Sequence, residues 1–162
     1  MKEATLCLLI KNEKITLAKK KRKIGVDQLN GYGGKVEPGQ TIEEAAVEET
    51  FDESKGFDGS KGVIIKESDL EKVAICSFYN SNEHPDFKVH VFIVREWEGE
   101  PGETEEMGPP QEFNLDNIPY DEMMDADRLW MSLVLSGKKI KANIHYDANG
   151  EVEEFSYTET EF

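Results

Sequence analysis

The sequence contains few of the side chains that hold zinc or form disulfides. Two cysteines and three histidines occur among its 162 residues, and no pair of them has the spacing of a metal site. Cys7 and Cys76 lie within apolar segments, so we expect buried free thiols in a reducing compartment. His90 lies within a run of strand-forming residues and is expected to be structural. These features predict a cytoplasmic protein without a disulfide framework.

The sequence also has no long hydrophobic run. The apolar segment near the N-terminus, residues 4–10, is much shorter than the roughly 20 residues that cross a membrane. It is also too short for the hydrophobic region of a signal peptide together with its flanks. We therefore expect no membrane contact.

Basic residues are scarce relative to acidic ones. The chain has 19 lysines and arginines against 34 aspartates and glutamates, for a net charge of −15. Such a balance argues against binding of long nucleic acid, whose affinity comes largely from cationic side chains on phosphates. It would also repel a small polyanionic substrate unless metal ions neutralise the site. One basic cluster, residues 19–23, is either a solvated strand end or a phosphate contact.

The length and the pattern of the chain predict one domain, residues 1–162, and we expect a monomer. Periodicity and β-branched content predict strands at residues 4–10, 15–19, 63–65, 71–79, 87–94, 140–146 and 152–157. Asn149-Gly150 predicts a hairpin between the last two. A second helix is expected over residues 125–136, ending at Gly137. This mixed order of helices and strands predicts the α+β class with a mixed sheet.

The segment 30–57 is the most distinctive part of the chain. It opens with Gly31, Gly33 and Gly34, which allow a tight turn and a close approach of the backbone to a ligand. Thr41 followed by Glu44 forms a capping-box pattern, so a helix should begin near Ile42. Gly56 offers a left-handed conformation to end it.

Three carboxylates share one face of this helix. Glu49 and Glu53 are four residues apart, and Asp52 is three residues from Glu49. Like charges at these spacings repel, by a few tenths of a kcal/mol per pair, unless a positive charge lies between them. Oxygen ligands clustered in this way suit a hard cation such as Mg²⁺. The alternative is a solvated acidic helix face in a very acidic protein.

The glycine turn and the acidic helix together resemble the Nudix box, G-x5-E-x7-R-E-U-x-E-E-x-G-U, where U is aliphatic. The residues that agree are Gly34, Glu49, Glu53 and Gly56-Phe57, with Asp52 as a conservative replacement. Gln40 replaces a glutamate, Glu48 replaces the arginine, and one extra residue precedes Gly56. The arginine of the family braces the glutamates. With Glu48 in its place, we expect Lys55 or a metal ion to offset the added repulsion.

The resemblance covers nearly the whole chain and is strongest to the MutT branch, particularly the oxidised purine nucleoside triphosphatases (8-oxo-dGTP diphosphatases). The shared strings are LNGYGGKV at residues 29–36, VHVF at 89–92 and LDNIP at 115–119. The resemblance implies a Nudix fold, an α/β/α sandwich with a mixed sheet in which the box forms a loop–helix–loop.

The resemblance also assigns roles at the metal and phosphate end. The metal ligands would be the Gly33 carbonyl and the side chains of Glu49, Asp52, Glu53 and Glu106. The implied cofactor is Mg²⁺, with Mn²⁺ as a possible substitute. Either Glu53 or Glu106 would be the catalytic base, and the sequence does not separate them. Lys20 and Lys35 would contact the substrate phosphates.

At the base-binding end the resemblance points to Asn30, Phe78, Met124 and Asp127. Met124 replaces a tryptophan of these relatives, and Ala126 replaces the first of two paired aspartates, so that only Asp127 remains. Ile24 replaces an aromatic residue at the pocket wall.

The resulting functional hypothesis is metal-dependent hydrolysis of oxidised purine nucleoside triphosphates to monophosphate and diphosphate, a nucleotide-pool sanitation reaction that supports DNA repair. One alternative is a Nudix hydrolase acting on dinucleoside polyphosphates, capped ends or nucleotide sugars, motivated by the altered base pocket. Another is a non-catalytic nucleotide-binding protein, motivated by Gln40 and Glu48.

Overall fold

The structure, a computed structural model, describes residues 1–57, 59, 61–81 and 85–162, so His84 lies outside the described residues. Within them the strands are β1 (Lys2–Lys11), β2 (Lys14–Lys19), β3 (Leu29–Asn30), β4 (Leu70–Asn80), β5 (Phe87–Val94), β6 (Gln111–Asn114), β7 (Ile140–Tyr146) and β8 (Val152–Glu159). The α-helices are α1 (Ile42–Ser54) and α2 (Asp127–Leu135), and the short 3-10 helices are Glu67–Asp69 and Tyr120–Glu122.

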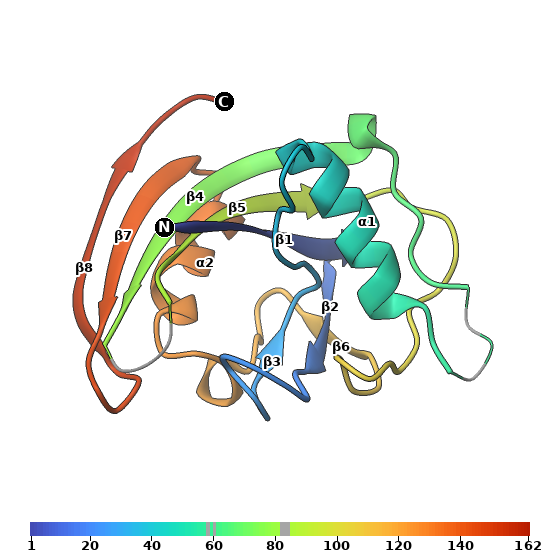
Figure 1. Ribbon diagram of the computed structural model, residues 1–162, viewed down its shortest axis with the longest axis horizontal. Coiled ribbons are helices and arrows are strands. Elements are labelled where there is room, and N and C mark those ends of the chain that lie inside the picture. Colours follow the sequence, from blue (N-terminus) through green and yellow to red (C-terminus); the bar gives the residue numbers. More distant parts are fainter. Residues whose placement is uncertain (58, 60, 82–84) are drawn as a thin grey trace.

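The strands form one mixed sheet in the order β3-β2-β1-β5-β4-β7-β8, with β6 paired to β2 (Figure 1). The β1–β5 and β4–β7 pairs are parallel. The remaining pairs in this sheet are antiparallel, including the terminal β7–β8 hairpin. The predicted α+β class with a mixed sheet is therefore confirmed.

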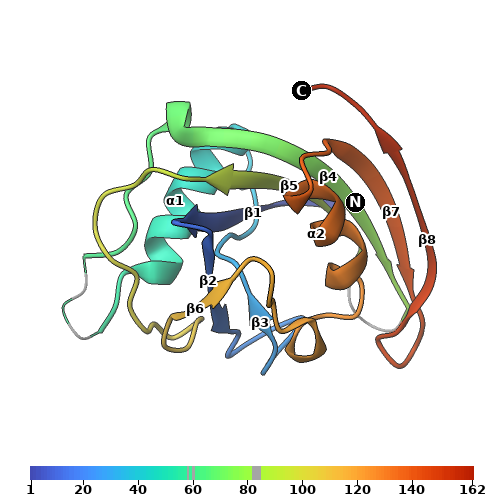
Figure 2. The ribbon, with the colours of Figure 1, turned by 180° about the vertical axis from the view of Figure 1, so that it is seen from behind.

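The two helices cover opposite faces of the sheet, as Figures 1 and 2 show from front and back. Alternate residues of β1 point to opposite faces. Cys7 and Leu9 pack in the cluster that contains Ala46 of α1. Leu6 and Leu8 pack in the cluster that contains Trp130 of α2. Because residues 6–10 of β1 are buried on both faces, this part of its sequence is continuously apolar. These layers form the α/β/α sandwich that the resemblance implies.

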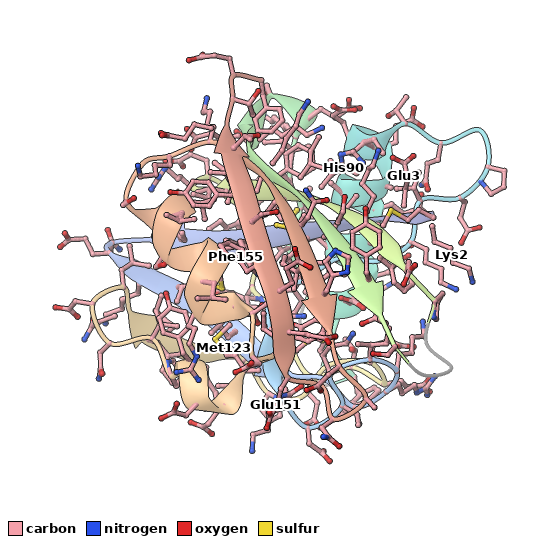
Figure 3. All side chains as sticks on the ribbon, turned by 90° about the vertical axis from the view of Figure 1, so that its left-hand side faces the viewer. Lys2, Glu3, His90, Met123, Glu151 and Phe155 are labelled. Carbon is pink, nitrogen blue, oxygen red and sulfur yellow. The ribbon has the colours of Figure 1, made fainter. Side chains whose placement is uncertain are left out.

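Figure 3 views the sheet from the side of β8, with Phe155 of that strand in front of α2. Phe155 packs against the hydrophobic cluster that contains residues of α2, and Met123 belongs to the same cluster. His90 Nε2 lies 2.9 Å from Glu3 Oε1, and His90 is only 6% exposed. Burial lowers the pKa of His90. The prediction of a structural histidine is consistent with this buried contact.

Helix α1 begins as predicted but ends differently. The Thr41 side chain accepts a hydrogen bond of 3.0 Å from the Glu44 N–H, which caps the helix start. At the other end, Lys55 leaves the helix in an extended conformation with φ −73° and ψ 99°, and the helix has already ended at Ser54. Gly56 is not among the glycines with positive φ, so the predicted left-handed conformation at the helix end was wrong. Tertiary contacts end the helix instead, because Gly102 N–H donates to the Ser54 carbonyl and Val63 N–H donates to the Ser54 hydroxyl, both at 2.8 Å.

Three other local predictions had different outcomes. Residues 63–65 form no strand, and only an isolated bridge joins Ile64 to Glu98. The hairpin prediction is confirmed, with Gly150 at φ +76° between β7 and β8. Helix α2 begins at Asp127, two residues later than predicted. Among the described residues, no helix has the length and apolarity needed to cross a membrane.

Candidate active site

The glycine loop before α1 lies directly against β1. Tyr32 exchanges two backbone hydrogen bonds with Cys7, at 2.6 and 3.2 Å, and the Gly34 carbonyl accepts from the Thr5 N–H at 2.8 Å. A Cβ at Gly33 would collide with the Thr5 carbonyl, and one at Gly34 would collide with the Glu49 carboxylate. Glycine is therefore required at Gly33 by contact with the backbone of β1, whereas at Gly34 the contact is with the end of a flexible side chain that can move. The approach to a ligand, on which the prediction rested, is not needed to explain it.

A cavity of about 200 Å³ opens between this loop, the ends of β4 and β5, and α2. Nine of the predicted site residues line it: Lys20, Asn30, Gly33, Lys35, Glu53, Phe78, Glu106, Met124 and Asp127. These residues come from distant parts of the chain, so the sheet order brings them together. Glu49 and Asp52 are outside the cavity wall, on the neighbouring surface of α1.

Glu53 stands at one end of the cavity beside a backbone donor. Its Oε1 accepts a hydrogen bond of 2.9 Å from the Gly33 N–H. The pKa of Glu53 is raised to about 7, mainly by burial and in part by the charges of Glu49 and Glu106, while the Gly33 N–H and Lys20 act in the opposite direction. Burial also lowers the pKa of Lys20. A nearby divalent cation would favour the ionised form of Glu53.

Glu106 reaches the same end of the cavity on a loop that is tied to α1. The Thr104 hydroxyl donates to the Glu53 carbonyl at 3.2 Å and accepts from the N–H groups of Glu106 and Met107. Thr104 is only 6% exposed. Sequence reasoning missed Thr104, because its partner on α1, Glu53, is far away in the sequence and no motif includes Thr104.

The basic cluster of residues 19–23 has a divided role. Lys21 pairs with Glu103 at 2.7 Å, and Arg22 pairs with Glu105 and Glu106 at 3.2 and 3.3 Å. Lys20 and Lys23 line the cavity. Neither sequence-based alternative describes the whole cluster. Lys21 and Arg22 pair with glutamates of the loop 103–106. Lys20 and Lys23 lie where a phosphate group could contact them.

Two of the residues that depart from the box pattern, Gln40 and Glu48, contact each other. The Gln40 amide donates a hydrogen bond of 2.7 Å to Glu48, while the Gln40 carbonyl oxygen accepts from the Glu37 N–H at 3.0 Å. Lys55 lies with its Nζ 5.6 Å from the centre of the Phe51 ring. The expectation that Lys55 offsets the charge of Glu48 is therefore not supported, and the amide of Gln40 is the group that contacts this carboxylate.

The acidic face of α1 suits a hard cation. Glu48, Glu49 and Asp52 each offer a carboxylate oxygen, and these oxygens lie within 4.8 Å of one another. Burial raises the pKa of Glu49, and the charges of Asp52, Glu48 and Glu37 raise it further. A divalent cation would relieve this repulsion, and oxygen-only ligands are those that Mg²⁺ prefers. Glu48 was not predicted as a ligand. The predicted ligands Glu53 and Glu106 lie at the cavity and are not members of this three-carboxylate group.

The other end of the cavity holds a buried carboxylate. Asp127 is 5% exposed; its Oδ1 accepts from the Trp130 indole N–H at 3.0 Å, while its Oδ2 has no hydrogen-bond partner among the described residues. Burial raises the pKa of Asp127 to about 7. A buried polar atom without a partner is costly, so this oxygen is suited to meet a ligand.

Asn30 and Phe78 flank the same end. Asn30 Oδ1 accepts a hydrogen bond of 2.9 Å from the Gly31 N–H, which orients the amide at the cavity wall. Phe78 stacks in parallel with Tyr146, with ring centres 6.0 Å apart. Asn80, at the end of β4, also lines the cavity and was missed by sequence reasoning because it lay in an expected loop. The cavity thus has a charged end suited to phosphate and an end with apolar and polar groups suited to a base.

Comparisons with known proteins agree with this geometry. The NUDIX domain family profile matches residues 1–134. The oxidized purine nucleoside triphosphate hydrolase of Danio rerio is 34% identical over 157 residues, covering 97% of this chain and 94% of the relative. The enzyme of the same name from Mus musculus is 33% identical with the same coverage. The MutT protein of Bacillus halodurans has a similar fold, with a TM-score of 0.76 at 20% identity, covering 97% of each chain.

Proposed function

The chain belongs to the Nudix hydrolase family, and from that membership we propose that it hydrolyses oxidised purine nucleoside triphosphates to monophosphate and diphosphate. The observation that carries the proposal is the buried Asp127, which lines the same cavity as Glu53 and has one oxygen without a hydrogen-bond partner among the described residues. A purine edge offers both donors and acceptors to such a group. The relatives named as oxidized purine nucleoside triphosphate hydrolases support the same choice of substrate.

In the proposed reaction the residues at the charged end hold the metal and the phosphates. Glu49, Asp52, Glu53 and Glu106, with the Gly33 carbonyl, would hold Mg²⁺ or Mn²⁺. When bound, the cation neutralises phosphate charge and lowers the pKa of the attacking water. Lys20 and Lys35 contact the phosphate groups. This arrangement allows a protein of net charge −15 to bind a polyanion.

Of the two candidate bases we favour Glu53. A general base is most effective when its pKa is near the working pH, and burial raises the pKa of Glu53 to about 7. The Gly33 N–H fixes one carboxylate oxygen, so the other can take a proton from water. Glu106 is instead held by the Arg22 guanidinium at 3.3 Å.

At the opposite end, Asn30 and Asp127 read the edge of the base and Phe78 packs beside the ring. A carboxyl group with a pKa of about 7 can donate a hydrogen bond when protonated and accept one when ionised. Met124 is flexible and gives less ring stacking than an indole. A single aspartate and a thioether should therefore discriminate less sharply among purines than the pocket of the relatives does.

The test is a product assay with Mg²⁺ over 8-oxo-dGTP, dGTP, dATP and dCTP, for the native chain and for Asp127→Asn. We expect monophosphate and diphosphate from the purines, with a modest preference for 8-oxo-dGTP over dGTP. Asp127→Asn should lower kcat/KM on purines more than on dCTP. A preference for dCTP would contradict the proposal.

Three further substrates cover the alternatives raised by the sequence: a dinucleoside polyphosphate, a capped dinucleotide and a nucleotide sugar. Turnover of these alone would place the chain in another branch of the family. Binding of nucleotide without any turnover would make it a non-catalytic member.

A further inference from the structure

A second cavity of about 420 Å³ adjoins the first and shares part of its wall. The four shared residues are Lys23, Ile24, Asn80 and Met124. The rest of the wall comes from the loop before β3, from Ser81 after β4 and from the β7–β8 turn. Its volume lies within the roughly 300–1,000 Å³ of small-molecule sites, whereas the first cavity, at about 200 Å³, is below that range.

The second cavity extends from the base-binding end. Asn80 follows Phe78 on the same face of β4, and the Met124 carbonyl accepts a hydrogen bond of 2.9 Å from the Asp127 N–H. Lys20, Glu53 and Glu106 line the first cavity but not the second. A group that enters the second cavity must therefore be attached near the base. The second half of a dinucleoside polyphosphate would leave from the phosphate end instead.

Part of the wall shared by the two cavities belongs to a strained loop, the segment before β3. Lys23 has φ +67°, a left-handed conformation that costs a non-glycine residue energy and often marks a functional site. Gly25 has φ +81°, and a Cβ there would lie 3.2 Å from Met124 Sδ, so glycine leaves room for this side chain. The Gln28 amide donates to the Met123 carbonyl at 3.1 Å and ties the loop to the segment before α2. Met124 itself is unbranched and can move aside for a ligand.

We propose that the second cavity receives a bulky substituent carried by the base of a purine nucleoside triphosphate, such as an aromatic group on an exocyclic nitrogen. This inference rests on the proposed function and extends its substrate class. Ile24, Val26 and Met124 are apolar residues in the wall of the second cavity, and Tyr146 also lines it. The base itself stays between Asn30, Phe78 and Asp127 in the first cavity.

The experiment compares N6-benzyl-dATP with dATP, and N2-benzyl-dGTP with dGTP. In the native chain at least one benzyl substrate should have a kcat/KM within tenfold of its parent. Val26 lines only the second cavity and is 49% exposed, so a larger side chain there can fill the cavity from its open side. Val26→Trp should lower the ratio of benzyl substrate to parent at least tenfold. Ile64→Trp is the matched control, because Ile64 is an exposed apolar residue, 46% exposed, that lines neither cavity, and it should keep the native ratio.

A binding measurement separates this inference from the proposed function. Calorimetry with N6-benzyl-dAMP, N2-benzyl-dGMP and their parents needs no turnover. At least one benzyl compound should bind the native chain as tightly as its parent or more tightly, and Val26→Trp should remove that binding selectively. Hydrolysis of dATP and dGTP with rejection of both benzyl substrates and both benzyl monophosphates would overturn the inference alone. Absence of hydrolysis of every triphosphate would overturn the proposed function, while the calorimetry would still decide the inference.

Discussion

Glu53 connects the glycine loop, the acidic face of α1 and the cavity through a single carboxylate. Glu53→Gln keeps the shape of the side chain and removes its charge and basicity. We expect kcat/KM to fall at least 100-fold, equivalent to about 2.7 kcal/mol of barrier. Steady-state assays with Mg²⁺ measure the loss. Glu153→Gln, an exposed change on β8, is the control and should retain activity. Turnover close to the native rate in Glu53→Gln would refute its assignment.

Asp127 makes a second residue-scale prediction, about pH. Burial raises its pKa from 3.8 to about 7, so between these values the folded chain holds a proton that the unfolded chain has lost. Stability must therefore fall as pH rises from about 4 to 7 and then level off. The loss amounts to several kcal/mol, at about 1.4 kcal/mol per pKa unit.

The measurement is urea unfolding from pH 4 to pH 8 for the native chain and Asp127→Asn. The variant cannot ionise, so its stability should decline less across this range. Burial raises the pKa values of Tyr120, Tyr146 and Cys76, and the charge of Asp127 raises them further. These groups therefore do not titrate in this window. Parallel curves for the two forms would show that Asp127 ionises normally in the fold.

At the scale of an element, α1 carries more negative charge than its surroundings neutralise. Glu48 adds to the carboxylates of Glu49 and Asp52, and among the described residues the neutral amide of Gln40 is the group that donates to it. Glu48→Arg replaces this repulsion with attraction. The loss of the Gln40 hydrogen bond offsets part of the gain, since such bonds contribute about 0.5–1.5 kcal/mol.

We expect the melting temperature of Glu48→Arg in chelator to exceed that of the native chain by about 2–4 °C, the shift that 1 kcal/mol produces at this chain length. Glu48→Gln, which removes charge without adding any, should show part of the increase. Mg²⁺ should reduce both differences by neutralising the cluster. A melting temperature in chelator that is unchanged or lower would show that repulsion at residue 48 is unimportant.

At the scale of the whole molecule, the net charge of −15 opposes the approach of a triphosphate. Activity should therefore require a divalent cation. Chelator should abolish hydrolysis, Mg²⁺ or Mn²⁺ should restore it, and Ca²⁺ should restore little because its looser coordination suits the site less well. Monovalent salt at matched ionic strength is the control for simple screening. Hydrolysis that persists in chelator would refute the metal requirement.

The sequence by itself determined the features that depend on near neighbours. The Thr41 cap, the Asn149-Gly150 hairpin and the strands at residues 71–79 and 87–94 follow from side chains within a few positions of each other. The spacing of Glu49 and Asp52 likewise placed two carboxylates on one face of a helix. The family, and the cavity residues assigned with it, came from a resemblance to known sequences and not from periodicity.

Only the tertiary structure decided which distant residues meet. Gln40 contacts Glu48, Thr104 holds the end of α1, and Gly102 and Val63 end that helix before Gly56. The second cavity likewise arises where the loop before β3 meets the turn after β7. Such contacts depend on the order of strands in the sheet and on packing across both of its faces. No short-range pattern carries that information, because each partner is locally an ordinary loop or surface residue.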